Sequence, residues 1–572
     1  MDRGLKREGF AVIAVLLLAA TTMQAHAATI TVTNTNDSGP GSLRQALANA
    51  NNGDRFNFAV TGTITLTSGG LVVTKNVTIS GPGANQLSID GNQATLVFGV
   101  FPQRTVSISG LSITNGQYGI WNEQGTLTVS NCVSSGNSFT GLYNHGGYDV
   151  GASVTIANSV ISNNSGTGAI NEVPPTCCFS TSTQPPIATP APFQMSDSNT
   201  LARNSADQLS DPDHCACMTI TDSVVSNNAE NGITNSGVFG FSTGPATLTV
   251  VNSNVSDNDG TGISNDGTEG VAIVTIAGTT ASGNSAGGVF TQEASGNFFG
   301  FAQVTITNST ISGNSANGGI RSQLSFLTVA KSTISGNSSG DIGGGIYASR
   351  FPANNPSASI VNSTISGNSA GTSGGGIYAM DFTVNNSPSI SIVNSTISGN
   401  SAGTSGGGIY NSPGTVEIAN CTVSGNSAGS GGGIYNQPTQ TRLSVVEISN
   451  TILNAGALGA NIFNSGTVTS HGYNLSSDDG GGYLNGPGDQ IDTDPLLGPL
   501  QDNGGPTFTH ALSPRSPAIN AGDPSFTPPP LYDQRGSPFV RVFNGRIDIG
   551  SFEAEPRHPR RHPTPHPRPT PP

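Results

Sequence analysis

Short runs in which apolar and polar residues alternate recur along most of the chain. One of them is Val304-Thr305-Ile306, and stretches of Asn, Ser and Gly separate it from the next short apolar piece. Alternation with a period of two, bounded by turn-forming residues, predicts short β-strands. The repeats contain no stripe with the 3.6-residue spacing of a helix, and the 77 Gly and 35 Pro of the chain also disfavour helices. The pattern therefore predicts an all-β protein.

The strands belong to a repeated unit. The letters NSTISGNSAGTSGGGIY begin at Asn362 and occur again, unchanged, from Asn394. Looser copies share a second Asn that marks each unit: Asn137, Asn164, Asn228, Asn258, Asn284, Asn314, Asn337, Asn368, Asn400 and Asn426. Successive markers lie 23 to 32 residues apart, except for one step of 64 that spans a segment of different composition. A unit of this size cannot bury its own apolar side, but copies stacked on one another can.

Stacking such units in parallel, about 4.8 Å apart, gives a parallel β-helix. Every residue then lies above its counterpart in the previous coil, so identical environments select identical residues. We expect Ile397 over Ile365 and Asn400 over Asn368, with the Asn amides hydrogen-bonded along their column. Turn positions favour Asn and Gly because these residues tolerate left-handed backbone angles.

The first residues have the features of a secretory signal. Three cations precede an apolar run from residue 10 to 20, and Ala25-His26-Ala27 fits a cleavage site. We expect five parts: a signal peptide (1–27), an N-terminal cap with the first coils (28–105), β-helix repeats (106–450) with an insertion (172–217), a C-terminal capping domain (451–554) and a Pro-rich, basic, disordered tail (555–572). The protein is expected to be exported, either extracellular or on the outer cell surface.

A short helix is expected to cover the first coil. The stretch GSLRQALANANNGD from Gly41 offers Ser42 as an N-cap, followed by apolar residues at helical spacing (Leu43, Ala46, Leu47 and Ala50). This stretch resembles the CSLREA-type motif found at the start of many exported bacterial repeat proteins, with Gly41 in place of the Cys.

Two further resemblances concern the repeats and the C-terminal region. From about Val106 to Asn450 the repeats are similar to those of chlamydial polymorphic outer membrane proteins and other right-handed β-helix surface proteins, which implies a right-handed, single-stranded parallel β-helix. DTDPLLGPLQDNGG and the later DQRG at Asp533 and DIGSFE at Asp548 resemble the choice-of-anchor Q domain, over about residues 450–554. We expect Arg535 to form salt bridges with Asp533 and Asp548 that close this region.

Charge and hydropathy exclude some functions. The net charge of the chain is -14, and because the signal carries +1 and the tail +3, the body from 28 to 554 carries -18. With 9% charged residues, its surface is mostly uncharged and unsuited to nucleic acid. No stretch after the signal approaches 18 apolar residues, so no membrane-spanning segment is expected.

The six cysteines fall into two groups. Cys177, Cys178, Cys215 and Cys217 lie in the insertion, where disulfides are expected in an exported protein; a metal site that includes His214 is the alternative. Cys132 and Cys421 occupy the same slot of the repeat nine coils apart, a separation on the order of 43 Å. These two cannot form a disulfide with each other.

Acidic residues suggest one possible catalytic centre. Polysaccharide lyases and hydrolases need carboxylates on neighbouring coils, as acid and base or as calcium ligands, often near a cation. The best cluster comprises Glu230, Asp257, Asp259, Asp266 and Glu269, with Arg321 about two coils further on. Calcium could be held at Asp257 and Asp259, or at Asp492 and Asp494, although all of these residues could also be plain turn formers. His145, His471 and His510 are expected to be loop residues.

Aromatic residues suggest a binding face instead. The position after the inward aliphatic residue of each GGIY-like piece should point outward. It holds Trp121 and Tyr143 early in the chain and later a ladder of four tyrosines: Tyr347, Tyr378, Tyr410 and Tyr435. Such a ladder suits stacking on sugar rings, or it merely shields the sheet.

These features favour a secreted or surface-exposed structural and binding protein, adhesin-like, that contacts extracellular polysaccharide, cell-surface glycan or neighbouring cells. The alternative is an extracellular polysaccharide lyase or glycoside hydrolase with a pectate-lyase-like fold. No cofactor is expected, apart from the possible calcium.

Overall fold

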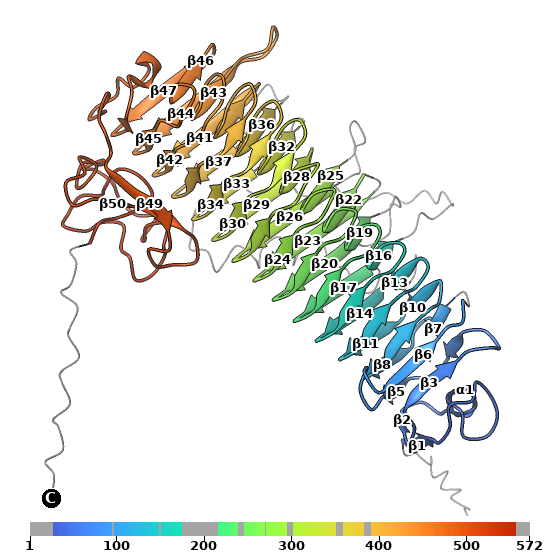
Figure 1. The fold of residues 1–572 in the computed structure, drawn as a ribbon. Helices are drawn as coiled ribbons and strands as arrows, with labels where there is room; N and C mark the ends of the chain where they lie inside the picture. The colour runs from blue at the N-terminus through green and yellow to red at the C-terminus, as the bar shows by residue number, and fades with distance from the viewer. Residues whose placement is uncertain are drawn as a thin grey trace, which may run out of the picture.

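The chain forms a long stack of parallel coils (Figure 1). The computed structural model describes residues 27–93, 96–147, 150–173, 216–237, 245–268, 270–293, 301–350, 358–381 and 390–555. Residues 1–26, where a signal peptide is predicted, most of the insertion, Glu269 and the residues from 556 onward lie outside these ranges. Within them, three parallel sheets of 16, 15 and 14 strands run the length of the stack. We name them sheets 1, 2 and 3, in the order in which one coil passes through them.

Sheet 1 runs from β1 (Thr29–Val32) to β47 (Thr467–Gly472), and sheet 2 from β3 (Gly62–Thr65) to β48 (Leu475–Ser476). Sheet 3 positions the candidate site. Its strands are, in order, β4 (Leu71–Val73), β7 (Leu96–Val100), β10 (Tyr118–Glu123), β13 (Thr140–His145), β16 (Ala169–Val173), β19 (Ile233–Gly237), β22 (Ile263–Gly267), β25 (Val289–Glu293), β28 (Ile320–Gln323), β32 (Ile346–Arg350), β36 (Ile377–Asp381), β40 (Ile409–Asn411), β43 (Ile434–Asn436) and β46 (Ile462–Asn464).

Seven of the undescribed segments connect a strand of sheet 3 to the next strand of sheet 1. Their residues are 148–149, 174–215, 238–244, 269, 294–300, 351–357 and 382–389. From β8 (Thr105–Ser109) onward, two residues separate each strand of sheet 1 from the next strand of sheet 2. The varying step between repeats therefore arises mainly at one corner.

Like residues stack on like, as the repeat predicts. Ile365 pairs in register with Ile334 on one side and Ile397 on the other, and all three are fully buried. Similar aliphatic columns on each sheet merge into one continuous core. Because every coil repeats the same inward positions, the core has no boundary between coils.

The predicted Asn column is confirmed. The ten marker residues from Asn137 to Asn426 are all buried, and each side-chain Nδ2 donates to the Oδ1 of the next at 2.8 to 2.9 Å. The backbone N–H of each residue donates to the same Oδ1 at 3.0 to 3.2 Å. The left-handed backbone angle belongs to the preceding position, for example Asn163 (φ 55°) and Gly367 (φ 62°).

A second Asn ladder runs inside sheet 3, and the repeat analysis missed it. Asn122, Asn144, Asn171, Asn235 and Asn265 form successive amide-to-amide hydrogen bonds of 2.7 to 2.8 Å. A shorter ladder joins three further Asn residues, Asn411, Asn436 and Asn464. Several of these residues directly follow an outward aromatic side chain. The ladder therefore fixes the strands that carry the outward aromatic residues.

Cys132 and Cys421 do occupy the same slot. Both are buried free thiols in a corner column otherwise filled by Ser or Thr. The N–H of Cys132 donates to Ser159 Oγ at 3.2 Å, and that of Cys421 to Thr451 Oγ1 at 3.2 Å. Cys217 lies on β17 (Ala216–Thr221), but Cys177, Cys178 and Cys215 lie outside the described residues, so the disulfides remain a prediction.

The N-terminal helix is confirmed. Helix α1 (Leu43–Ala48) begins at Ser42, whose side chain accepts a hydrogen bond from the N–H of Gln45. The apolar residues Leu43, Ala46, Leu47 and Ala50 are buried against the first coil. Arg44 ties the helix to Asp37 by an ion pair of 2.5 Å.

The C-terminal region differs from expectation in its placement. Coils continue beyond Asn450 through β47 and β48, and the region that follows folds back onto the flank of the stack rather than only over its end (Figure 1). Residues 495–555 include the hairpin of β49 (Leu497–Gln501) and β50 (Thr509–Leu512). They cover the outward side of β34 (Thr364–Ser366), β38 (Thr396–Ser398) and β42 (Thr422–Ser424) in sheet 2.

Buried hydrogen bonds join this flank to the stack. Thr396 Oγ1 donates to Gln534 Oε1 at 2.6 Å, and Thr364 Oγ1 to the carbonyl of Phe508 at 2.6 Å. His510 lies 2.8 Å from Ser398 Oγ. The prediction that His510 is a loop residue is wrong, since it sits on β50 within this interface.

The expected salt-bridged closure is half correct. Arg535 forms an ion pair of 2.6 Å with Asp533, and its guanidinium lies between the rings of Phe539 and Phe552, 3.7 and 3.8 Å from their centroids. Asp548 does not join this pair and instead accepts the N–H groups of Asn520 and Ala554. The neutralising cation beside Asp548 is Arg541, which is fully buried.

Arg541 holds the flank to the stack. Its Nη2 donates to Asn420 Oδ1 in the stack and to the carbonyls of Asp548 and Gly550 in the flank. Burial lowers the pKa of Arg541, while the charges of Glu553, Asp533 and Asp548 act to raise it. Because Nε and Nη1 have no partner among the described residues, these carboxylates supply much of the compensation for the buried charge.

Glu553 should make the stability of this region depend on pH. Burial and the charge of Asp548 raise the pKa of the Glu553 carboxyl from 4.5 to about 8, although Arg541 acts in the opposite direction. The folded state therefore binds this proton more tightly than the unfolded state. The resulting stabilisation is complete below about pH 4.5 and is lost as the pH rises towards 8, by up to about 1.4 kcal/mol per pH unit.

Limited proteolysis of residues 495–555 should therefore be faster at pH 8 than at pH 6.5, after correction for protease activity. The substitution E553Q should flatten the difference because it removes the titrating group. An equal pH dependence in wild type and E553Q would contradict this assignment.

Candidate functional site

One outward column of side chains runs the full length of sheet 3. Its members pair in register from coil to coil: Val72, Gly99, Trp121, Tyr143, Ile170, Thr234, Ser264, Phe290, Arg321, Tyr347, Tyr378, Tyr410, Tyr435 and Phe463. Their neighbours in each strand point inward, so the period of two places this column on the outside. We call it the outward column. Aromatic rings gather at both of its ends.

The C-terminal end is the predicted tyrosine ladder, extended by Phe463. Centroids of successive rings lie 5.5, 4.8, 5.2 and 4.8 Å apart, with interplanar angles of 12° or less. The guanidinium of Arg321 covers the other end, 4.3 Å from the ring centroid of Tyr347. The rings therefore cover one another's faces.

Exposure is uneven along this ladder. Tyr347 and Tyr378 are only 8% exposed, Tyr410 and Tyr435 are half-buried, and Phe463 is 41% exposed. Burial raises the pKa of Tyr378 and of Tyr410, which keeps their hydroxyls protonated. Ring edges and hydroxyls, rather than ring faces, are open to a ligand here, and contact with glycan remains a prediction.

The N-terminal end carries an aromatic–acid cluster that comprises Tyr118, Trp121, Glu123, Tyr143, His145 and Glu172. Trp121 and Tyr143 stack with centroids 4.6 Å apart and an interplanar angle of 23°. Tyr118 packs edge-on against both rings, at 4.8 and 5.8 Å. The six side chains come from three adjacent strands, β10, β13 and β16.

Hydrogen bonds fix the acids of the cluster. Trp121 Nε1 donates to Glu123 Oε2 at 2.7 Å, and His145 Nδ1 lies 3.0 Å from the same oxygen. Burial acts to raise the pKa of Glu123, but the hydrogen bonds from His145 and Trp121 outweigh it, and the pKa is lowered. The hydroxyl of Tyr143 donates to Glu172, and burial together with this acid raises the pKa of Tyr143.

The predictions for the histidines here and near the end of the stack are wrong. His145 ends β13 and faces Glu123, and His471 lies on β47, 3.5 Å from Glu447. Glu123 and Glu172 were missed altogether. The signal was present, because each stands two positions after a member of the outward column and so points to the same side.

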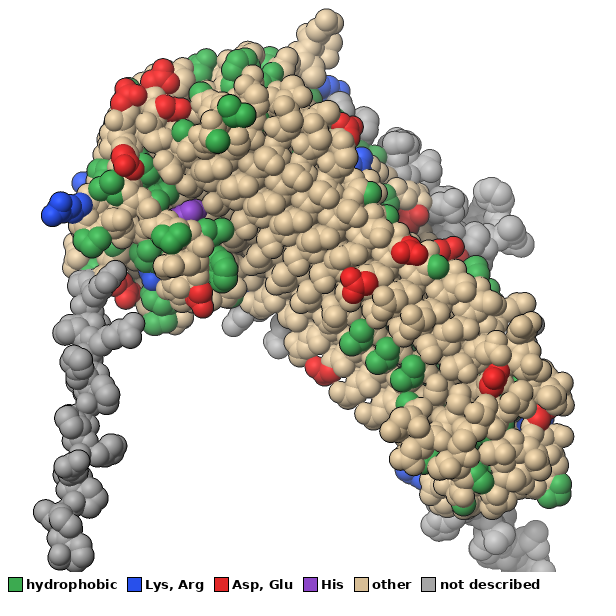
Figure 2. Space-filling model, in the orientation of Figure 1, with side chains coloured by type: hydrophobic (Ala, Val, Ile, Leu, Met, Phe, Trp, Pro, Cys, Tyr) green, Lys and Arg blue, Asp and Glu red, His purple; other side chains and the backbone are tan. Residues whose placement is uncertain are grey.

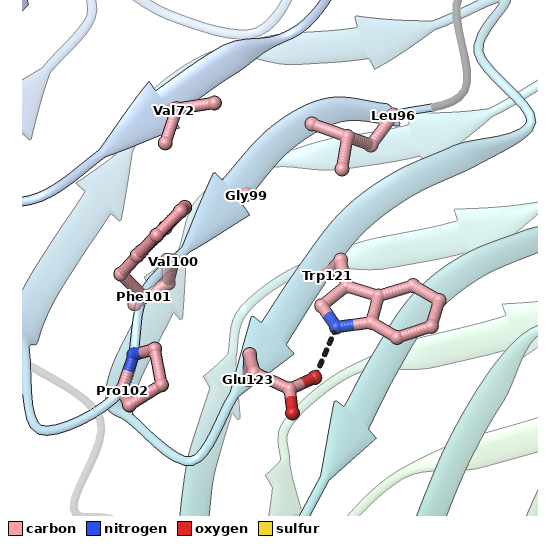
Figure 3. A pocket seen from close by; sticks show the side chains of 8 residues that line it. All are labelled: Val72, Leu96, Gly99, Val100, Phe101, Pro102, Trp121 and Glu123. Atoms are coloured by element: carbon pink, nitrogen blue, oxygen red, sulfur yellow. Dashed lines mark hydrogen bonds between the residues drawn. The ribbon is translucent and has the colours of Figure 1, made fainter.

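A shallow hollow of about 210 Å³ adjoins the cluster (Figure 3). Its lining residues are Val72, Leu96, Gly99, Val100, Phe101, Pro102, Trp121 and Glu123. In Figure 3, Gly99 lies between Val72 and Trp121, its register partners on β4 and β10. The hollow thus occupies the position in the outward column where Gly99 provides no side chain.

The described acids of the predicted centre take up corner and strand positions. Glu230, Asp257 and Asp259 are exposed corner residues, and Asp257 has a left-handed φ of 56°, as Gly283 has (66°) in the next coil. Asp266 points outward from β22 and accepts the N–H of Thr268. Arg321 stacks on Tyr347 instead of approaching these acids.

The proposed calcium ligands have turn roles. Asp494 accepts the N–H of Leu496, and Asp492 has a left-handed φ of 50°. Among the described residues, no group of three or more His, Cys, Asp or Glu side chains is arranged to hold a metal ion.

The surface and the helices agree with the composition. Charged side chains are sparse over the middle of the stack on the face seen in Figure 2, where most of the surface is uncharged. None of the described helices is long and apolar enough to cross a membrane.

Comparisons with known proteins concern the fold. Residues 236–441 match the family model for the right-handed β-helix region, and no curated protein matches the chain. Solved structures of similar fold include the mannuronan C-5 epimerase AlgE6 A-module of Azotobacter vinelandii (11% identity, 77% of this chain and 97% of that chain, TM-score 0.38). Others are pectate lyase Pel9A (14% identity, 92% and 96%, TM-score 0.29) and the catalytic unit of an α-1,3-glucanase from Streptomyces thermodiastaticus (13% identity, 78% and 71%, TM-score 0.35).

At these identities and TM-scores the likeness carries no activity to this chain. The all-β architecture, the three parallel sheets and the matched region together give the fold that the repeats predict: the chain is a right-handed parallel β-helix.

Proposed function

We propose that this protein is an exported, adhesin-like β-helix protein that binds polysaccharide along the outward column of sheet 3. The observation that carries the proposal is the column itself, in which rings and polar side chains are held in register by inward Asn ladders. Rigid aromatic side chains with nearby hydroxyl and carboxylate groups suit sugars, which present apolar ring faces and hydroxyl rims. The sparsely charged surface and the signal-like N-terminus agree with an extracellular glycan partner.

The alternative is a polysaccharide-cleaving enzyme. One observation favours it: Glu123 with His145 and Glu172 with Tyr143 form two hydrogen-bonded pairs on adjacent coils. Such pairs are what general acid–base catalysis requires. If the protein is an enzyme, its catalytic residues are therefore expected in the aromatic–acid cluster and not among the corner acids.

Both functions can be tested with the chain from Ala28 onward on an array of plant and microbial polysaccharides, with and without calcium. Retention without new reducing or unsaturated ends is the expected result, and cleavage would favour the alternative. Y435A should weaken retention about fivefold if its ring contributes about 1 kcal/mol of contact. F301A is the matched control, because Phe301 stacks on Phe326 on the outer face of sheet 1. Failure of every polysaccharide to bind would refute the proposal.

A further inference from the structure

Trp121 has one covered ring face and one open face. Tyr143 stacks on the side of the next coil, 4.6 Å away. On the other side the register partner is Gly99, which has no side chain to place on the indole. Among the described residues, the stacking of the outward column therefore stops at Trp121, and the hollow lies where the next ring would be.

The hollow has an apolar rim on its far side. Val72 is 46% exposed and Phe101 is 48% exposed, although both are large hydrophobic residues. Leu96, Val100 and Pro102 complete the apolar lining. A planar group placed over Gly99 would be in contact with the Trp121 face and with this rim, and its apolar surface would leave water.

The polar end of the hollow is Glu123. Oε2 is occupied by Trp121 and His145, but no described residue donates a hydrogen bond to Oε1. The side chain is 31% exposed, and its lowered pKa keeps it a carboxylate at neutral pH. Oε1 can therefore accept a hydroxyl hydrogen from a bound group, and the two bonds on Oε2 hold it in position.

The negative charge around the hollow restricts the kind of sugar that can bind there. Glu123 is the one charged residue that lines the hollow, and Glu172 lies in the same cluster. Lys75 and Arg104 follow the lining residues Val72 and Pro102 in sequence but do not line the hollow themselves. The body of the chain from 28 to 554 carries -18 in total. A uronate placed here would bring its carboxylate towards Glu123 without a compensating cation.

We propose that the hollow over Gly99 binds one pyranose ring of an uncharged polysaccharide, stacked on the open face of Trp121, with a ring hydroxyl donated to Glu123 Oε1. This inference rests on the proposed glycan-binding function and adds a subsite and a class of sugar to it. The bound ring continues the outward column in place of the side chain that Gly99 lacks.

A substitution that fills the space tests the subsite without weakening the fold. A Cβ at Gly99 would lie 3.3 and 3.4 Å from the two terminal methyl groups of Leu96, which is a flexible side chain, and Gly99 has no left-handed φ. G99L should therefore fold and lay its side chain over Trp121. T305L is the matched control, because it adds the same side chain at an outward position of β26 (Phe301–Thr307) in sheet 1, away from the hollow and from the outward column.

Trp121 is the only tryptophan of the chain, so tryptophan fluorescence reports directly on this subsite. Soluble neutral glucan and galactomannan should change the Trp121 emission, whereas polygalacturonate and alginate at matched ionic strength should not. G99L should weaken binding of the neutral polymer at least tenfold, and T305L should leave it unchanged.

Each other outcome has a separate meaning. If no polysaccharide is retained by the wild type, the proposed function itself fails. If polysaccharides are retained but the emission of Trp121 and the affinity of G99L do not change, glycan binding stands and this subsite is refuted. Stronger binding of the polyuronates than of the neutral polymers refutes the assigned class of sugar.

Discussion

Replacing Asn368 with leucine is expected to destabilise the stack by several kcal/mol. The Oδ1 of Asn368 accepts both the N–H and the Nδ2 of Asn337, at 3.0 and 2.9 Å, and its own Nδ2 donates to Asn400 and to the carbonyl of Ile334. Leucine has a similar volume but can replace none of these bonds. Each buried polar group left without a partner costs about 1–3 kcal/mol.

Guanidinium-induced unfolding followed by circular dichroism would measure the effect as a lower midpoint. S401A is the matched control, since Ser401 is exposed and lies one residue beyond the next member of the ladder, Asn400. Because each coil contacts only its neighbours, hydrogen exchange should increase first in the coils around residue 368. If N368L and S401A unfold at the same midpoint, the ladder does not contribute to stability.

Replacing Arg541 with methionine is expected to release the C-terminal flank from the stack. The substitution removes the hydrogen bond to Asn420 and leaves Asp548 and Glu553 buried without their neighbouring cation. Removing one partner of a buried charge cluster typically costs about 3–5 kcal/mol. Residues 495–555 should become sensitive to protease, while the far coils keep their circular dichroism signal.

R515M controls for the loss of a cation, because Arg515 is exposed on the same flank. Adding E553Q to R541M should restore part of the protease resistance at pH 8, because burying Gln, unlike burying Glu, does not require the uptake of a proton. A flank that is as resistant in R541M as in R515M would show that Arg541 is not its anchor.

The sequence was sufficient for the aliphatic columns, the marker Asn column and the cap helix, although the Asn ladder inside sheet 3 was missed. Ile334, Ile365 and Ile397 could be stacked in advance because a parallel coil gives each of them the same surroundings. Cys132 and Cys421 were assigned to one column for the same reason. The cap helix was predictable because Ser42 and the apolar spacing after it are local signals.

The rest depended on contacts that the repeat does not encode. Glu123, His145 and Glu172 are 22 and 27 residues apart, and only the alignment of non-identical coils brings them together. Acids such as Asp257 suggested a site because they are close in sequence. In the structure Asp257 is a turn residue, whereas Arg321 lies over the ring of Tyr347. The flank is held by single contacts between residues that are far apart in the sequence, such as Gln534 and Thr364. No periodic pattern predicts such contacts.

At the corner between sheet 3 and sheet 1, the length of the connecting segment can change while the strand register stays the same, although these two properties depend on each other in most folds. Strand register is set along the stack by the Asn ladders and the aliphatic columns, whereas the length of the connection at this corner varies from 2 residues, as between Gln323 and Phe326, to 42, as between Val173 and Ala216. Successive coils are thus spaced by about 4.8 Å, and new sequence can be inserted at this corner of a chosen coil. Peptides grafted at 294–300 and 351–357 would stand two coils apart, at a spacing that the scaffold sets and the inserts do not alter.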